Sequence, residues 1–259
     1  MRICLLGSGS KGNSLYVESH STAIIIDQGF SYSEFEKRMC SRGLDVKKIK
    51  AIFVSHEHSD HVGGVGVTAR RLNIPVYGTK GTLYKNKNIF NGAEELISIE
   101  SGIDFSLSPF EIHPFSVSHD AADPVQFSIR SGKKKLTIAT DLGFISTLVE
   151  QQLRDSDIII IEANHDIDML KKGSYPWELK QRILSRTGHL SNRNAAEIIF
   201  NISLDKKISP RVILAHVSEE NNRPELAERE ILSLFENFDK SISSLIVAPQ
   251  HEATFIIEL

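Results

Sequence analysis

Residues 55–61 read Ser-His-Glu-His-Ser-Asp-His and directly follow the apolar run 51–54. Three histidines and one aspartate, all of which can bind a metal ion, fall within six consecutive residues of this segment. Neutral imidazoles and carboxylates are natural ligands of zinc and similar divalent ions, and a loop leaving a rigid strand can aim alternate side chains in one direction. We therefore expect His56 and His58 to hold one ion. Asp60 and His61 would reach a second, whereas the alternative is a polar surface loop with accidental histidines.

Length and composition limit the class of protein that carries this motif. With 259 residues and 41% hydrophobic content, the chain can bury a full core, and we expect one domain over residues 1–259. The net charge of −3 argues against a protein that coats nucleic acid, but not against local contacts with a few phosphates. The apolar runs are too short to span a bilayer and no basic leader precedes the first of them, which predicts a cytoplasmic protein without a membrane partner. Cys4 and Cys40 are expected to be reduced and buried.

Strands and helices interleave along the chain. The patterns predict strands at 3–6, 15–18, 23–27, 51–55, 75–77, 95–99, 110–117, 125–130, 135–140, 158–161, 212–215 and 245–247. They predict helices at 33–42, 62–72, 144–153, 176–184, 192–202 and 224–238. Fully apolar strands such as 158–161 need cover on both faces, so two sheets packed face to face with helices outside would bury these runs. The pattern alone predicts a layered α/β protein.

The motif at residues 56–61 resembles the signature of the metallo-β-lactamase superfamily, and the resemblance extends over nearly the whole chain. It implies a four-layer αββα sandwich. The family pattern calls for a lone histidine at a strand end, an aspartate that bridges both ions, and a late histidine. His119, Asp141 and His216 fit these places, since each follows a strand-like apolar run. For each of them, the alternative is an ordinary polar side chain at a strand end.

The resemblance assigns every ligand. The first ion would be bound by His56, His58 and His119, the second by Asp60, His61 and His216, and Asp141 would bridge the two. Zinc suits the histidine-rich first site, whereas the second could also take Mn²⁺ or Fe²⁺. Two such ions can share a bridging hydroxide that acts as the nucleophile of a hydrolase.

A phosphodiester also needs its leaving oxygen protonated. The segment Gly188-His189-Leu190-Ser191 resembles the extra histidine segment of the tRNA 3′-processing endonuclease branch, in which a glutamate after an apolar strand holds the histidine. Glu162 occupies that place and would favour the charged imidazolium of His189. We therefore count His189, Glu162 and Asp60 as the catalytic residues. The alternative is that His189 is only a polar residue beside the helix-capping Ser191.

Four segments in combination look like the YycJ/WalJ group, a set of nuclease-like proteins for which exonuclease action on DNA is proposed. They are residues 6–14, 161–166, 188–192 and 214–222. The resemblance implies a phosphodiesterase with a nucleic-acid substrate, DNA being favoured. A hydrolase of a thioester, lactone or small cyclic phosphodiester stays as the first alternative, and a non-catalytic metal-binding or nucleic-acid-binding protein as the second. His189 and Glu162 favour the phosphodiesterase, because acyl-transfer relatives can do without them.

Some features stay open at this stage. The Gly/Ser-rich segment 7–14 could form a phosphate-binding nest or simply a tight hairpin. Asn164 and His165 could line the pocket or be structural. Tyr175 and Trp177 could stack on bases or pack against the protein. Basic pairs and a triplet could contact a nucleic-acid backbone or be solvated surface, namely Lys47-Lys48, Arg70-Arg71, Lys133-Lys134-Lys135, Lys171-Lys172 and Lys206-Lys207.

Overall fold

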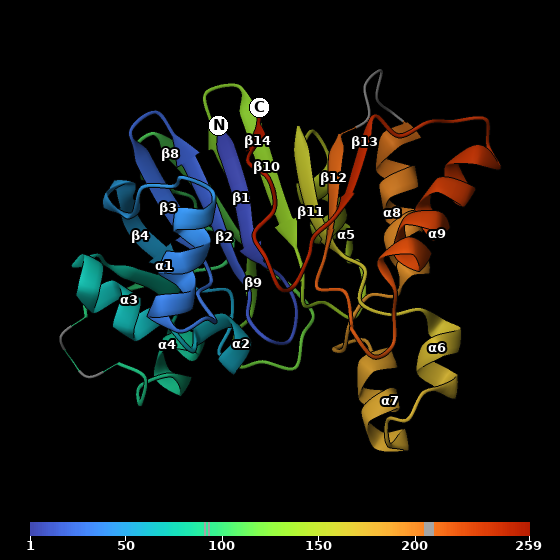
Figure 1. Ribbon diagram of the computed structural model, residues 1–259, viewed down its shortest axis with the longest axis horizontal. Coiled ribbons are helices and arrows are strands. Elements are labelled where there is room, and N and C mark those ends of the chain that lie inside the picture. The colour runs from blue at the N-terminus through green and yellow to red at the C-terminus, as the bar shows by residue number, and fades with distance from the viewer. Residues whose placement is uncertain (91, 93, 205–209) are drawn as a thin grey trace. The chain divides into compact units, whose positions relative to one another are not determined.

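The computed structural model describes residues 1–90, 92, 94–204 and 210–259, so the pair Lys206-Lys207 lies outside the described residues (Figure 1). The chain forms two compact units. The first comprises Met1–Ser116, Ala121–Lys134 and Pro249–Leu259, and the second comprises Val117–Asp120 and Lys135–Ala248. The single domain expected from composition stays a prediction. Among the described residues, no helix is long and apolar enough to cross a membrane.

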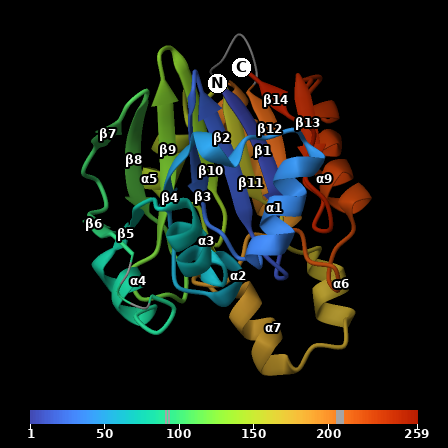
Figure 2. The same ribbon diagram turned by 60° about the vertical axis from the view of Figure 1, so that its left-hand side comes forward.

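The first unit is built on a mixed sheet whose order is β14-β1-β2-β3-β4-β5-β6. The strands are β1 (Arg2–Gly7), β2 (Ser14–Ser19), β3 (Thr22–Ile26), β4 (Ile49–Phe53), β5 (Val76–Thr79), β6 (Leu96–Ile99) and β14 (Ile257–Glu258). Strands β1 to β3 pair antiparallel, whereas β3 to β6 are parallel. Helices α1 (Tyr32–Ser41) and α3 (Val65–Leu72) bury Phe35 and Val65 in the core with residues of this sheet (Figure 2).

Aromatic side chains join this sheet to a second, antiparallel group of strands in the same unit. That group comprises β7 (Phe105–Leu107), β8 (Phe110–Ser116) and β9 (Val125–Ser131). The Phe53 ring on β4 stacks on Phe105 at a centroid distance of 5.5 Å and meets Phe127 edge-on at 5.9 Å. Two sheet faces therefore pack together behind β4, which holds the start of the histidine motif firmly.

The second unit contains four parallel strands, β10 (Lys134–Ala139), β11 (Ile158–Glu162), β12 (Arg211–Ala215) and β13 (Ser244–Val247). Every side chain of β11 is buried, as expected for a strand with cover on both faces. Figure 1 shows α8 (Asn192–Leu204) and α9 (Pro224–Glu236) beside these strands, with α5 (Thr147–Leu153) behind them. The carboxyl ends of β10, β11 and β12 deliver Asp141, Glu162 and His216, since parallel strands end at one edge of a sheet.

The structure differs from the predicted elements in a few places. The helix predicted at 62–72 is present as α3 but begins at Val65, because Gly63 and Gly64 separate it from the short α2 (Ser59–Val62). A Cβ at Gly64 would lie 1.9 Å from the carbonyl oxygen of Phe30, so the chain must turn there without a side chain. Further elements, α4 (Lys80–Lys85), α6 (Ile167–Lys172), the 3-10 turn Val46–Lys48, β7 and β14, were not predicted. Cys40 is exposed rather than buried, because Phe35 and Met39 turn the other side of α1 to the core.

Candidate metal centre

In the first unit, a buried carboxylate organises the histidine motif. Asp27, directly after β3, accepts hydrogen bonds from the backbone N–H of Ser55 at 2.8 Å and from the Ser55 hydroxyl at 2.7 Å. The His61 ring donates from Nδ1 to the same carboxylate at 2.8 Å. Because the Ser55 hydroxyl in turn lies 2.9 Å from His56 Nδ1, Asp27 fixes both rings and leaves each Nε2 as the nitrogen available to a metal.

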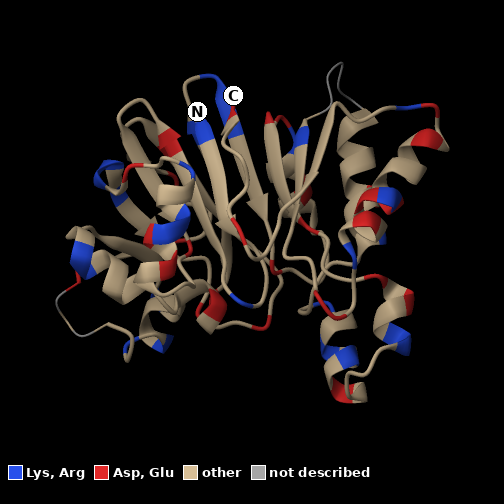
Figure 3. Cartoon of the chain, in the orientation of Figure 1, with Lys and Arg blue, Asp and Glu red and all other residues tan. Residues whose placement is uncertain are grey.

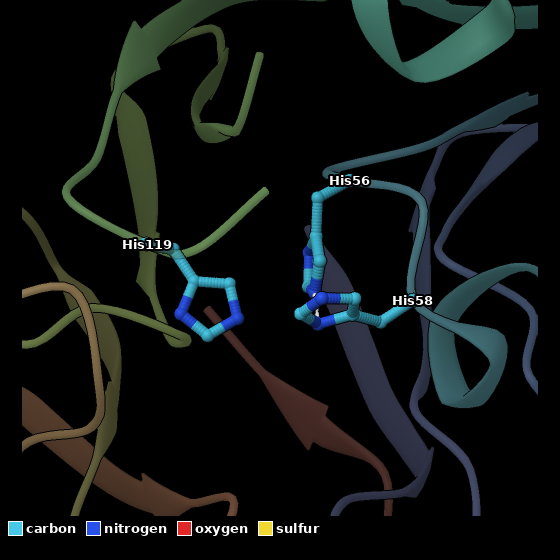
Figure 4. A group of neighbouring side chains, drawn as sticks. All are labelled: His56, His58 and His119. Atoms are coloured by element: carbon cyan, nitrogen blue, oxygen red, sulfur yellow. Dashed lines mark hydrogen bonds between the residues drawn. The ribbon is translucent and has the colours of Figure 1, made fainter. Parts of the chain in front are cut away.

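The other two residues of the motif lie beside these rings. His56 Nε2 and His58 Nδ1 face each other at 3.1 Å (Figure 4). The Asp60 carboxylate lies 3.4 Å from His61 Nε2. Nitrogens and oxygens that face one another at such distances are spaced like neighbouring ligands of one ion. The first unit therefore brings together four of the predicted ligands, His56, His58, Asp60 and His61.

The Gly/Ser-rich segment 7–14 is a hairpin turn between β1 and β2, and several of its backbone N–H groups donate within the protein. Gly9 N–H donates to the Asn13 side chain, and Gly12 N–H donates to the Gly9 carbonyl. Asn13 Nδ2 lies 3.0 Å from Asp60 Oδ2 and 3.0 Å from His61 Nε2. The segment thus supports the metal motif, which favours the hairpin interpretation over the phosphate nest.

In the second unit, Glu162 plays the part that Asp27 plays in the first. Its side chain is fully buried, and its Oε1 lies 2.7 Å from Nδ1 of His189 and 2.7 Å from Nδ1 of His216. Its Oε2 accepts from the backbone N–H groups of Leu142 and Leu190. The sequence predicted Glu162 beside His189, but not that the same carboxylate also fixes His216.

The remaining predicted residues of the second unit are His119 and Asp141. His119 Nδ1 lies 3.2 Å from the Gly188 carbonyl oxygen, which again leaves Nε2 as the available nitrogen. Asp141 Oδ1 lies 3.4 Å from His216 Nδ1 and 4.0 Å from His189 Nδ1. Asp141 and His216 both adopt left-handed backbone angles, φ 55° and φ 52°, a conformation that non-glycine residues hold mainly where the surrounding structure imposes it.

The charges of this cluster depend on one another. Burial raises the pKa of a carboxyl group, yet His189 and His216 outweigh burial and hold the pKa of Glu162 far below its ordinary value. Burial lowers the pKa of His189, but the Glu162 carboxylate more than offsets it and raises that pKa. For His119, burial dominates and lowers the pKa, which keeps the ring neutral. A neutral imidazole is the form that binds a metal.

The side chains fit a divalent metal. Asp141, Glu162, His189 and His216 offer ligand atoms that all lie within 4.8 Å of one another. Histidine rings whose Nδ1 is held by an oxygen of a carboxylate, a carbonyl or a hydroxyl group, with Nε2 available, are the usual form of metal-binding histidine. His56, His61, His119 and His216 share this form, through Ser55, Asp27, Gly188 and Glu162 respectively.

Two residues of uncertain role are structural in part. Asn164 donates from Nδ2 to the His216 carbonyl oxygen at 3.0 Å and so supports the loop after β12. The His165 ring is buried, and burial lowers its pKa to about 4. Asp27 and Asn13 are the supporting residues for which sequence reasoning gave no role. A lone aspartate at the end of a predicted strand was the only available signal for Asp27.

Comparison with known proteins identifies the family of this chain. A family model described as a β-lactamase superfamily domain matches residues 22–217. The exodeoxyribonuclease YycJ of Bacillus anthracis is 34% identical over 245 residues, covering 91% of this chain and 89% of that protein. The exodeoxyribonuclease WalJ of Streptococcus pneumoniae is 33% identical over 243 residues, covering 92% and 89%.

Among solved structures, the metallo-β-lactamase fold protein YhfI from Bacillus subtilis matches with a TM-score of 0.74 and 15% identity, covering 99% of each chain. The predicted αββα fold class, with two sheets flanked by helices, is confirmed by this likeness. The chain belongs to the β-lactamase superfamily and, within it, to the YycJ/WalJ group of metal-dependent hydrolases.

Proposed function

We propose that this chain is a dinuclear metal-dependent nuclease that cleaves phosphodiester bonds of DNA from a strand end. The observation that carries the proposal is the contact of 2.7 Å between the buried Glu162 carboxylate and Nδ1 of His189. This contact provides a proton donor for a leaving oxygen, which a phosphodiester needs and which an activated acyl substrate can do without. The names of the two curated relatives support DNA as the polymer and exonuclease action as the mode.

In this proposal both units contribute ligands. His56, His58 and His119 would hold the first ion, Asp60, His61 and His216 would hold the second, and Asp141 would be a ligand of both. The order of these residues in the chain and the support of four of the five rings, those of His56, His61, His119 and His216, by a fixed partner favour this assignment. When bound, two divalent ions would supply a nucleophile from water and neutralise the charge that gathers on the phosphate oxygens.

The protein groups have separate tasks. Asp27 and Glu162 hold the ligand histidines in one ring orientation. His189, whose side chain is 20% exposed, can meet a substrate with the ring nitrogen that Glu162 does not hold. That nitrogen donates a proton to the leaving oxygen while Glu162 stabilises the charged ring. We also infer a cytoplasmic location, where a DNA substrate would be found.

The experiment compares substrates at matched metal loading. End-labelled single-stranded DNA, duplex DNA and RNA, together with a simple thioester, are incubated with the wild type and with Asp141→Ala in zinc or manganese. We expect metal-dependent release of nucleotides from DNA ends, and loss of that release in Asp141→Ala. Thioester hydrolysis without DNA cleavage by the fully metallated protein would move the assignment to the acyl-transfer alternative. If RNA alone is cleaved, the assigned substrate changes from DNA to RNA.

A further inference from the structure

Residues 166–188 form a short helical arm in the second unit, composed of α6 and α7 (Trp177–Leu184). Figures 1 and 2 show both helices beyond the ends of strands β10 to β13, away from α8 and α9. The Asp166 side chain caps α6 by accepting from the Met169 N–H at 2.8 Å. The Lys180 ammonium donates to the carbonyl oxygens of Lys171 and Gly173, which fixes the turn between the two helices. The arm is therefore an ordered element.

Residues 182–187, at the C-terminal end of the arm, contact the backbone at the candidate site. His189 N–H donates to the Ile183 carbonyl oxygen at 3.0 Å, and Asp120 N–H donates to that of Thr187 at 3.1 Å. The Arg182 guanidinium forms an ion pair with the Asp120 carboxylate. Since Asp120 follows His119 directly, residues 182–187 of the arm contact the backbone next to both candidate site histidines.

The arm exposes apolar side chains along one helix face. Trp177 is 63% exposed and Leu184 is 42% exposed. With the exposed Gln181 between them, they lie at spacings of four and three residues and so share one side of α7. Large apolar side chains that are exposed to water along one helix face commonly mark a binding surface.

The charge of the arm points to the kind of partner. Five of its residues are basic, Lys171, Lys172, Lys180, Arg182 and Arg186, against three acidic ones, Asp166, Asp168 and Glu178. The arm thus carries a net charge of about +2 on a chain whose net charge is −3, and Figure 3 shows the basic segments on both of its helices. The Arg186 guanidinium lies 3.9 Å over the Phe144 ring, which places one of these five cations beside the segment after Asp141.

We propose that the arm binds a single strand of DNA on its way to the metal centre, with a base stacked on the Trp177 ring and the backbone along Lys171 and Lys172. This proposal rests on the proposed nuclease function. An exposed indole with basic neighbours matches unpaired nucleotides, because their bases offer a flat apolar face and their phosphates are negative. A duplex offers only its terminal base pair for such stacking, so the arm should prefer single strands.

Trp177 is the only tryptophan of the chain, and its fluorescence therefore reports on the arm alone. The metal-loaded protein is titrated by stopped flow, before turnover, with oligothymidylate and with an abasic strand of equal length and charge. We expect oligothymidylate to quench the fluorescence and to bind more tightly than the abasic strand. In Trp177→Ala, followed by anisotropy of a labelled strand, binding of oligothymidylate should weaken at least about fivefold, whereas binding of the abasic strand should not change.

Two controls separate stacking from general damage. Phe238→Ala removes another exposed aromatic ring, 59% exposed and outside the arm, and should bind both strands as the wild type does. Hydrolysis of bis(4-nitrophenyl) phosphate, a small substrate that does not reach the arm, should be unchanged in Trp177→Ala. Equal quenching by both strands, or an equal loss of affinity for both in Trp177→Ala, would overturn the proposal. Binding is measured without cleavage, so the two proposals can fail separately. If the protein stacks on single-stranded DNA but cleaves none, DNA binding by the arm stands and the proposed nuclease function fails.

Discussion

At the scale of single residues, two buried carboxylates carry the same task in different parts of the chain. Asp27 fixes the His61 ring directly and the His56 ring through the Ser55 hydroxyl. Glu162 fixes His189 and His216 through one oxygen. Outer partners of this kind set which ring nitrogen faces a metal and hold it there.

Asp27→Asn tests this role. Asparagine tolerates the left-handed backbone angle of residue 27, φ 57°, so the change removes mainly the charge and one acceptor. The Ser55 N–H, the Ser55 hydroxyl and His61 would then compete for a single oxygen, and metal affinity should fall about 10- to 100-fold. Asp45→Asn, which keeps the cap of a remote turn, is the matched control. Unaltered affinity in a metal titration of Asp27→Asn would show that Asp27 does not orient the ligands.

Much of the candidate site could be predicted from the sequence, because its side chains are concentrated in a short motif and at strand ends. The motif places His56, His58, Asp60 and His61 within six consecutive residues. Because they lie in one short loop, their side chains must be close to one another. Asp27 and Asn13 could not be predicted in the same way, since the residues of the motif that they contact lie 28 or more residues away and are brought to them by tertiary packing.

At the scale of elements, strand patterns predicted most of both units, because buried runs such as 158–161 have few alternatives. The break between α2 and α3 was missed, because the predicted helix was begun at Val62, before Gly63 and Gly64. What imposes the break is the close approach of Gly64 to the Phe30 carbonyl oxygen, which no local pattern encodes.

The same close packing predicts the effect of Gly29→Ala. A Cβ at Gly29 would lie 1.8 Å from the backbone oxygen of Asp60, so the metal motif would have to move. We expect a loss of about 1–3 kcal/mol in the free energy of unfolding, together with loss of bound metal. In Gly43→Ala the new methyl group meets nothing within 4 Å, and only the positive φ costs about 1 kcal/mol. Urea unfolding and metal analysis compare the two variants. Equal losses of stability and of bound metal in Gly29→Ala and Gly43→Ala would contradict this account.

At the scale of the whole molecule, the proposed ligands come from both compact units, so metal loading should stabilise the chain as a whole. A ligand that binds only the folded state at a thousandfold excess over its Kd contributes about 4 kcal/mol. Calorimetry should therefore show a higher Tm for the metal-loaded protein than for the chelated one, and a much smaller difference for Asp141→Ala. A melting curve that chelation leaves unaltered, although the metal has been removed, would argue against these ligands.

The most direct test of the central claim is the dependence of the rate on the leaving group. Wild type and His189→Ala, matched for metal content, are compared on a DNA strand and on bis(4-nitrophenyl) phosphate, whose leaving group departs without a proton. If His189 protonates the leaving oxygen, His189→Ala should lower kcat on DNA by about 10²–10⁴-fold and leave the activated ester nearly unaffected. An equal loss on both substrates, or none on DNA, would contradict that role.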